Sequence, residues 1–483
     1  MEHVIVKPMM SVVGILLWLL ASFPLWADVT DTLDLTAYLE ATLIYHQVQR
    51  EHDARAPAES LSLTAGERYY WPQVTARSDY SEITDETEAT QPSLSSRSVQ
   101  SGVTTGLDTT WTSWVGTDVT LGLEHQYGRQ LDKVSQGIPE DDLQAHTLSV
   151  EVSQPLLKQN TVFYNRLPLH RARTEWEQYR AEGELSRLTL LRDAMLDYLL
   201  VQEAHDRLDI QQEKLEHTLY LADLTETLVT EGRSLEIDLD LARLDALRQE
   251  QVVANAQLSL LQSRDKLSLP WVTDTDIRVQ SQPSISVLID LLLPILSDHS
   301  NADRHPEYRQ QQLLLRSATL EQRAAQRDRW PDLSFYYRYE KNYRDVLPDE
   351  ENQAWGLRIN YALFDLPTRE QQARRRADAT IARWNVEDME KQLRWETARR
   401  LENTETLLNE LALHAQSQAL SQRALDYELA RYREGLASYS AVQDRQKALL
   451  DREMEALTTQ LELARDLIEL GYYRQWDWLN QLH

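Results

Sequence analysis

The sequence predicts an α+β protein in which very long helices alternate with groups of strands, and two observations carry this prediction. Proline is absent from residues 169 to 269 and again from residue 368 to the end, and only two glycines interrupt each stretch. Around these stretches lie shorter segments that alternate in polarity or are rich in β-branched and aromatic residues, as strands are. The chain has 483 residues. Together these features indicate an elongated body rather than one small core.

The two proline-free stretches are predicted to be helices too long for an ordinary globule. Leu, Ala, Glu, Gln and Arg dominate them, and apolar residues recur at steps of three, four and seven, as in coiled coils. Residues 168 to 231 would form a helix about 95 Å long, and residues 367 to 434 one of about 100 Å. Helices of this length must bundle, and shorter return helices are predicted at 234–268 and 437–470. Asp365 and Pro367 suit the capped start of the second long helix.

Four strands are predicted, and aromatic residues gather near them. The strand segments are residues 73–81, 147–154, 333–340 and 356–364. Aromatic belts at a membrane interface and ordinary strand propensity both explain the clustering. The aromatic residues are Tyr69, Tyr70, Trp71, Trp330, Tyr336, Tyr337, Tyr339 and Trp355.

The same order of elements is predicted twice, with an insertion in the first copy. Pro72 and Gly232 are 160 residues apart, whereas the equivalent Pro331 and Gly435 are 104 apart. The additional segment, at about 90–142, is rich in glycine and predicts two more strands, at 99–112 and 117–127, joined by a tight turn. These strands either enter the same sheet or project from it as a hairpin.

The predicted domains follow from this repetition. A first repeat covers residues 28–268, a linker 269–304, a second repeat 305–470 and a C-terminal tail 471–483. Within the linker, residues 287–296 predict a buried helix, because the apolar run is too short to span a membrane and contains Asp290 and Pro294.

Composition excludes several classes of protein. The formal net charge is -27, which disfavours binding to nucleic acid. A mean hydropathy of -0.53 excludes a membrane protein made of many apolar helices. The chain has no cysteine, so disulfides, thiolate metal sites, cysteine nucleophiles and lipid-modified cysteines are all excluded.

The N-terminus predicts a signal peptide over residues 1–27. Lys7 provides the positive charge, residues 11–20 the apolar region, and residues 25–27 a cleavage site before Asp28. A transmembrane anchor is the alternative, but the apolar run is short for one. The sequence therefore predicts export.

No motif predicts an enzyme, a cofactor or a metal. Metalloprotease, P-loop and dinucleotide-binding patterns are absent from the sequence. Asp298, His299, Asp303 and His305 form a local His/Asp cluster, and its position between the repeats favours a solvated linker over a metal site.

Several motifs resemble those of the TolC family of outer-membrane efflux proteins, over essentially the whole chain after the predicted signal. His305-Pro306-Glu307-Tyr308 and Trp330 to Ser334 (WPDLS) resemble the opening of each family repeat. Residues 147–157 (TLSVEVSQPLL) resemble the strand before the long helix. Tyr432 to Gly435 (YREG), followed by Val442, resembles the helix-tip motif. The first copy departs from the pattern, with His46-Gln47-Val48-Gln49 at its opening.

The resemblance implies an α+β membrane protein with two internal structural repeats: a trimeric outer-membrane β-barrel continued by a long α-helical coiled-coil periplasmic barrel. Each protomer would add four strands to a twelve-stranded barrel, and residues 269–304 and 471–483 would form an equatorial belt. The implied role is the exit duct of a tripartite efflux or type I secretion system in a Gram-negative outer membrane. The implied partners are two further copies, outer-membrane lipid, a periplasmic adaptor and an inner-membrane pump. The alternatives are a non-conducting periplasmic scaffold or adaptor, and an acidic binding protein.

The resemblance also implies functional residues at the two helix tips. Gly232 and Gly435 would end the long helices, and Gly232, Arg233, Gly435 and Leu436 would contact the adaptor. Asp444, Asp238 and Tyr432 would form the periplasmic gate, with Tyr432 and Asp238 linking neighbouring helices. Ala441 and Ala437 stand where the family has a second aspartate and an arginine.

Overall fold

A computed structural model describes residues 35–87, 96–133, 140–158, 162–268, 284–297, 304–344 and 349–481. The predicted signal peptide and much of the predicted linker, including Asp298, His299 and Asp303, lie outside these ranges. The chain divides into two units, which we call the tip unit (residues 1–50, 186–301 and 394–483) and the sheet unit (residues 51–185 and 302–393). Two long helices, α5 (Leu167–Thr230) and α9 (Leu366–Arg433), have residues in both.

The predicted long helices are confirmed, with bounds within two residues of those expected. Local chemistry explains where α9 begins: an Asp365 carboxylate oxygen accepts a hydrogen bond from the backbone N–H of Thr368 at 2.9 Å. The hydroxyl and backbone N–H of Thr368 lower the pKa of Asp365. Pro367 occupies the first turn, where its missing N–H costs nothing. The return helices are α6 (Glu236–Ser268) and α10 (Tyr439–Arg474), and α10 takes in the first residues of the expected C-terminal tail.

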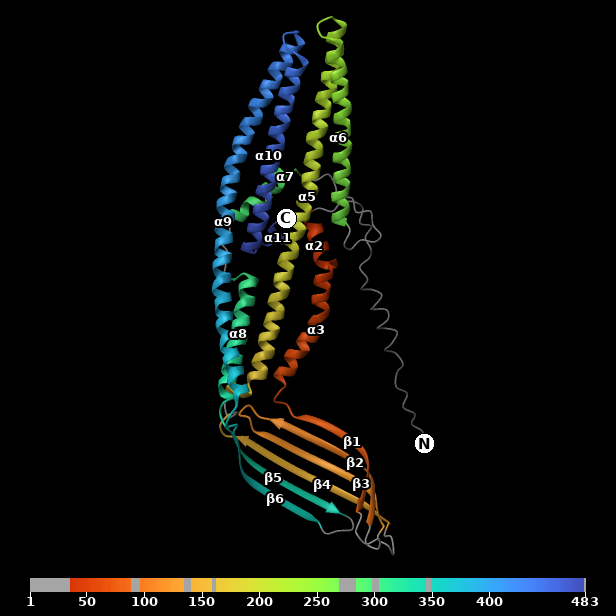
Figure 1. Cartoon of the computed structure of the whole chain (residues 1–483), viewed down its shortest axis with the longest axis vertical. Helices are drawn as coiled ribbons and strands as arrows, with labels where there is room; N and C mark the ends of the chain where they lie inside the picture. The colour runs from red at the N-terminus through yellow and green to blue at the C-terminus, as the bar shows by residue number, and fades with distance from the viewer. Residues whose placement is uncertain are drawn as a thin grey trace, which may run out of the picture. The chain divides into compact units, whose positions relative to one another are not determined.

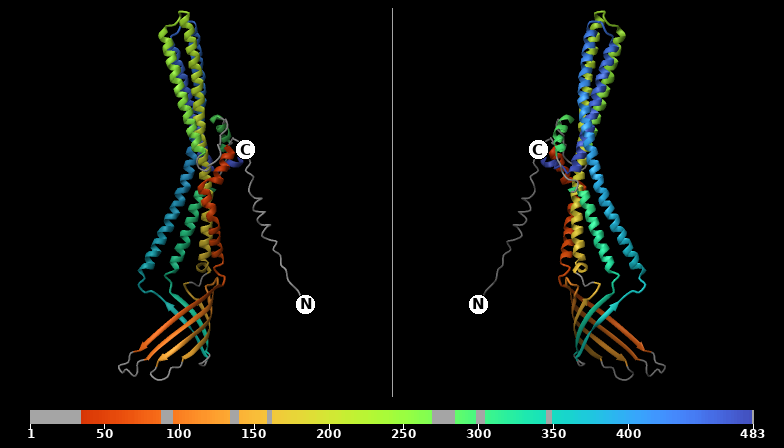
Figure 2. Two further views of the ribbon diagram at one scale, coloured as in Figure 1. Left: turned by 90° about the vertical axis from the view of Figure 1, so that its right-hand side faces the viewer. Right: turned by 90° about the vertical axis from the view of Figure 1, so that its left-hand side faces the viewer.

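Both long helices end in the glycine turn that the sequence predicts. Gly232 has φ 72° and Gly435 has φ 71°, a left-handed conformation in which a β-carbon is unfavourable. The backbone N–H of Gly232 donates to the carbonyl of Val229, and that of Gly435 to the carbonyl of Tyr432, both at 2.9 Å. Each turn reverses the chain, so α5–α6 and α9–α10 form two helical hairpins that lie side by side in the tip unit (Figure 2).

Short elements close the core at the other end of the tip unit. The predicted buried helix at 287–296 is α7 (Ile285–Leu292) followed by the 3-10 turn η2 (Leu293–Ser297), because Pro294 interrupts the α-helical hydrogen bonding. Their apolar side chains pack with α2 (Leu35–Tyr45), α10 and α11 (Trp478–Gln481). The guanidinium of Arg474 donates to the carbonyl of Ile295 at 2.6 Å and so holds η2 against the end of α10.

One antiparallel sheet of six strands dominates the sheet unit, in the order β1-β2-β3-β4-β5-β6 (Figure 1). The open question about the insertion is thereby answered: its two strands, β2 and β3, lie inside the sheet between β1 and β4. The sheet of one chain therefore has six strands where the resemblance implies four, because β2 and β3 take up the hydrogen bonds that would otherwise join β1 to β4. The strands are β1 (Gln73–Thr87), β2 (Ser96–Thr112), β3 (Asp118–Lys133), β4 (Glu140–Pro155), β5 (Asp332–Arg344) and β6 (Glu350–Asn360).

Helices α3 (Gln47–Glu67), α4 (Val162–Asn165) and α8 (Pro306–Arg327) complete the sheet unit. Exposed ion pairs join α8 to the start of α5; the Arg316–Glu177 pair, at 3.0 Å, is one of them. Pairs so exposed stabilise a helix contact by less than about 1 kcal/mol each. His305 begins α8 as its N-cap, so this member of the His/Asp cluster has a structural role. Among the described residues, no helix combines the length and apolarity needed to cross a membrane.

We expect Gly471→Ala to destabilise the tip unit. A β-carbon at Gly471 would lie 2.4 Å from the indole of Trp478, which is fully buried. Overpacking of this kind costs about 1–3 kcal/mol, so the melting temperature of the purified protein should fall. The double variant with Trp478→Leu should be more stable than the sum of the two single effects predicts. Additive effects, measured by circular dichroism, would contradict this packing.

Candidate functional site: the two sheet faces and the helix tips

One face of the six-stranded sheet is apolar from edge to edge. Side chains alternate between the two faces of a strand, and the register aligns the apolar positions of all six strands. Many of these side chains are strongly exposed; Trp355 is 75% exposed and Tyr80 is 70% exposed. Exposing a continuous apolar surface of this kind to water is unfavourable, so we expect lipid or protein to cover it. Its exposed large residues are Val74, Tyr80, Val103, Leu107, Trp111, Leu121, Leu123, Tyr127, Phe335, Tyr343, Trp355, Leu357 and Ile359.

The opposite face is polar, and an arginine spans three strands on it. Arg77 of β1, Gly106 of β2 and Glu124 of β3 lie in one row of the register. The Arg77 guanidinium reaches across β2 and lies 2.6 Å from the Glu124 carboxylate. A β-carbon at Gly106 would lie 2.8 Å from the Arg77 Nε, so glycine leaves the space for this crossing.

The polar face carries more carboxylates than arginines. Arg338 pairs with Glu151 at 2.8 Å, and Thr147 donates a hydrogen bond to Asn342 at 2.7 Å, both between β4 and β5. Arg77 also lies 3.7 Å from the Asp108 carboxylate, whereas Asp118, Asp332 and Glu340 have no arginine in their rows of the register. Alternation places on this face Asp79, Asp108, Asp118, Glu124, Glu151, Asp332, Glu340 and Glu350, with Arg77, Arg338 and Arg358.

The tips of the two helical hairpins share a small core. Leu221 and Leu228 of α5, Leu425 of α9, and Val442 and Leu449 of α10 are buried there against one another. Two tyrosines, Tyr432 and Tyr439, are also buried in this core. Because a buried hydroxyl without a partner is costly, the contacts of these two tyrosines decide how firmly the hairpins hold together.

Tyr432 is 2% exposed, and its hydroxyl lies 2.9 Å from the Thr225 hydroxyl of α5. It also lies 3.5 Å from the Ser234 hydroxyl, which donates to the Asp238 carboxylate at 3.2 Å. The expected contact between Tyr432 and Asp238 is therefore replaced by a chain that runs through Ser234. The turn at Gly232 places the Ser234 hydroxyl between the two groups, and Thr225 satisfies the tyrosine directly.

The other residues expected at the tips are exposed. Leu436 is 68% exposed, and Asp444 is exposed on α10. The Arg233 guanidinium lies 3.3 Å from Glu231 on its own hairpin and 4.0 Å from Glu434 on the other. The structure therefore brings Arg233 beside the second tip, whereas Asp444 faces solvent in the single chain.

A second contact between the hairpins was not predicted from the sequence. The Tyr439 hydroxyl donates to the Asp245 carboxylate of α6 at 2.9 Å, and Gln443 donates to the same oxygen at 2.6 Å. Burial raises the pKa of Tyr439, and the Asp245 carboxylate raises it further. The spacing of Tyr439 and Gln443 on one helix face is visible in the sequence. Their partner lies 194 residues from Tyr439 and has no local signal.

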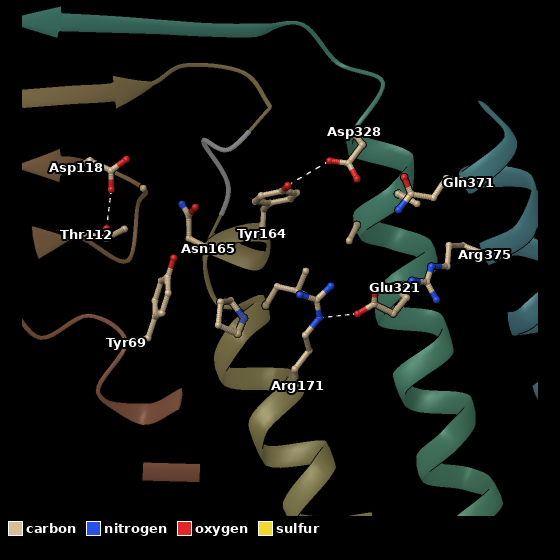
Figure 3. A pocket seen from close by; sticks show the side chains of 15 residues that line it. Tyr69, Thr112, Asp118, Tyr164, Asn165, Arg171, Glu321, Asp328, Gln371 and Arg375 are labelled. Carbon is tan, nitrogen blue, oxygen red and sulfur yellow. Dashed lines mark hydrogen bonds and ion pairs between the residues drawn. The ribbon is translucent and has the colours of Figure 1, made fainter. Parts of the chain in front are cut away.

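A polar cavity of about 270 Å³ lies in the sheet unit beside the turn between β2 and β3 (Figure 3). Arg171 donates to Glu321 at 2.5 Å, and Tyr164 donates to Asp328 at 3.2 Å. Burial and the Asp328 carboxylate raise the pKa of Tyr164 to about 12. The ionic groups in this cavity are paired with one another, which is typical of ion pairs that hold two helices together, here α5 and α8.

In the described part of the chain, the grouping closest to a metal site is His205, Asp206 and Asp209 on α5. Asp206 already accepts hydrogen bonds from the Ser284 hydroxyl at 3.2 Å and the Ile285 backbone N–H at 3.0 Å. Its position is therefore explained by the start of α7.

We expect Tyr439→Phe to change the alkaline stability of the protein. Folding raises the pKa of Tyr439 above the ordinary tyrosine value of 10. The stabilisation that Tyr439 provides is therefore complete below pH 10 and is lost at higher pH, as the pH rises through the raised pKa. The variant should be less stable by about 1.5–3 kcal/mol near neutral pH, because a hydrogen bond to a carboxylate is lost. The difference from wild type should shrink above about pH 10.

Melting curves across this pH range check that expectation. Tyr427→Phe is the matched control, because Tyr427 is an exposed tyrosine on α9. A constant difference between wild type and Tyr439→Phe from neutral to strongly alkaline pH would contradict the assigned role.

Comparison with other proteins identifies the fold. No protein-family model and no curated protein matches the chain. Among solved structures, it is similar to CusC, described for its transmembrane channel formation, with a TM-score of 0.65 at 14% identity, covering 91% of each chain. It is similar to VceC, an outer membrane protein of Vibrio cholerae, with a TM-score of 0.64 at 14% identity, covering 91% of this chain and 95% of that one.

The CmeC outer membrane channel of Campylobacter jejuni gives a TM-score of 0.62 at 11% identity, covering 91% of this chain and 85% of that one. Identities this low establish the fold and not the activity. The chain has the fold of the TolC family of outer-membrane channels, the family that its motifs resemble.

Proposed function

We propose that this protein is an exit duct in the outer membrane of a Gram-negative bacterium. The observation that carries the proposal is the sheet with one exposed apolar face and one polar face. A barrel wall in a membrane needs apolar side chains toward lipid and polar side chains toward a water-filled lumen, alternating along every strand. The fold adds support, since similar chains are described as an outer membrane protein and as an outer membrane channel.

A closed barrel requires more than one copy of the chain. Strands β1 and β6 are the edges of the sheet, and lipid offers no partner for the backbone groups of an open edge. β1 leads away from the helices and β6 returns to them, so β6 of one copy can pair antiparallel with β1 of the next. We propose a homotrimer, the assembly that the TolC resemblance implies.

The helical hairpins would extend into the periplasm and receive the partner proteins. We propose that the tips, with Gly232, Arg233, Gly435 and Leu436, contact a periplasmic adaptor of a tripartite efflux or type I secretion system with its inner-membrane pump. The exposed Leu436 and Arg233 supply an apolar and a charged contact for it. We also propose that Tyr432, Asp238 and Asp444 hold and line the closed periplasmic end.

A non-conducting periplasmic scaffold is the remaining alternative, and the apolar sheet face argues against it. In such a scaffold the thirteen exposed large apolar side chains of the apolar sheet face would lie in water. A surface of this kind promotes aggregation. An acidic binding protein with a helical spacer meets the same objection.

We expect cross-linking of the detergent-purified protein to give a three-chain species. The protein should also stay in the outer-membrane fraction after a high-salt wash, because apolar burial and not charge would hold it there. A scaffold would be released by the wash. A uniform monomer that conducts ions would contradict the trimer.

The proposed gate is tested by single-channel recording. Tyr432→Phe, Thr225→Val and Asp238→Ala should each raise resting conductance, because each removes a member of the hydrogen-bond chain that runs from Thr225 through Tyr432 and Ser234 to Asp238. Loss of about 1.4 kcal/mol would shift the closed-to-open equilibrium about tenfold.

Asp444→Ala should leave closure intact but reduce cation selectivity and block by multivalent cations. Three copies of Asp444 around one axis would attract cations. Asp240→Ala is the control, because Asp240 is an exposed carboxylate on α6. Conduction like wild type in all the variants would place the gate elsewhere.

A further inference from the structure

We propose that the β2–β3 hairpin is part of the barrel wall and that the assembled barrel has eighteen strands, six from each of three copies. The exit would then be wide enough for cargo much larger than a small solute. This inference rests on the proposed channel function and goes beyond the twelve-stranded pattern that the resemblance implies.

Hydrogen bonding along the whole hairpin is the first argument. β2 pairs with β1 from Gln73↔Thr110 to Thr87↔Ser96 without a break in register. β3 pairs with β4 from Asp118↔Ser153 to Leu131↔Glu140. A hairpin that projected from a four-stranded wall would leave β1 and β4 to pair with each other. Here they are separated by two full strands.

The distribution of apolar residues is the second argument. Val103, Leu107 and Trp111 of β2, and Leu121 and Leu123 of β3, are exposed on the same face as the apolar residues of the other four strands. Outside a membrane these side chains would face water. The hairpin therefore has the same lipid-facing pattern as the rest of the sheet.

Close packing on the polar side is the third argument. Arg77 of β1 crosses Gly106 to reach Glu124, which ties the hairpin to its neighbour over the full width of β2. Gly102 and Gly128 face each other in the register, and a β-carbon at Gly102 would lie 2.9 Å from the backbone carbonyl of Tyr127. At these two glycines the backbones of β2 and β3 lie closer together than a side chain on the polar side would allow.

The number of strands sets the diameter of a barrel. A strand tilted by about 40° takes roughly 6 Å of circumference, so eighteen strands give a backbone diameter of roughly 36 Å, against roughly 24 Å for twelve. Barrels of sixteen to eighteen strands retain an aqueous channel. The carboxylates of the polar face would make this exit acidic, which favours cationic or neutral cargo, polypeptides included, over polyanions.

Deleting residues 96–133 tests the width. The deletion leaves β1 and β4 antiparallel, joined by the segments on either side of the hairpin, and so would give a twelve-stranded barrel. The size of polyethylene glycol that still enters the channel and lowers its conductance should fall clearly in the deletion variant. An equal size limit in two conducting trimers would overturn the eighteen-stranded wall and leave the channel function standing.

Single cysteines in the full-length chain give a test that does not depend on folding of the deletion variant. The native chain has no cysteine, so a fluorophore can be placed at one site only. Label at Leu123→Cys should be quenched by spin-labelled lipid, whereas label at Gln126→Cys, on the polar face of the same strand, should be quenched by a water-soluble agent. Leu357→Cys on β6 is the reference for a lipid-facing site outside the hairpin.

The labels distinguish a failure of the wall assignment from a failure of the proposed channel. Lipid quenching at both Leu123 and Leu357 supports the hairpin in the wall. Lipid quenching at Leu357 alone overturns the wall assignment but keeps the channel. Absence of lipid quenching at both sites overturns the membrane-inserted barrel itself, and the eighteen-stranded wall with it.

Discussion

Backbone hydrogen bonding must be complete wherever water is absent, and the proposed membrane barrel depends on that requirement. An unpaired N–H or C=O group in hydrocarbon costs several kcal/mol, so each strand in lipid needs a partner on both sides. Within the chain, β2 to β5 meet this condition, and β1 and β6 do not. The two open edges, together with the alternating faces of the sheet, are why a single copy is an incomplete structure in a membrane.

The glycines of the sheet follow from the same requirement for continuous strands. Long side chains such as Arg77 must lie across neighbouring strands on the polar face, and Gly106 provides the room. Tyr336 similarly lies over Gly356, where a β-carbon would meet its hydroxyl at 3.1 Å. The sheet can therefore carry large side chains on its polar face without forcing its strands apart.

In the tip unit, buried tyrosine hydroxyl groups help to join the two helical hairpins. The long helices are stable through packing along their length, but the tips depend on a small core around Tyr432 and Tyr439. Each hydroxyl has its nearest hydrogen-bond partner on the other hairpin, Thr225 for Tyr432 and Asp245 for Tyr439. Breaking these two hydroxyl contacts would cost a few kcal/mol, which is in the range that the proposed opening of the gate requires.

Sequence alone determined the parts of this protein that depend on local preference. Helix propensity and the absence of proline predicted α5 and α9 almost to the residue, and Gly232 and Gly435 predicted the two turns. Alternation and β-branched or aromatic residues predicted parts of β1, β4, β5 and β6, and the glycine-rich insertion predicted β2 and β3. These signals are local because a helix or turn is set by neighbouring residues. The tertiary structure alone decided that β2 and β3 lie within the sheet, that Ser234 stands between Tyr432 and Asp238, and that Tyr439 contacts Asp245. Each of these joins residues far apart in the chain or depends on how a turn orients its side chains, and no local propensity encodes either.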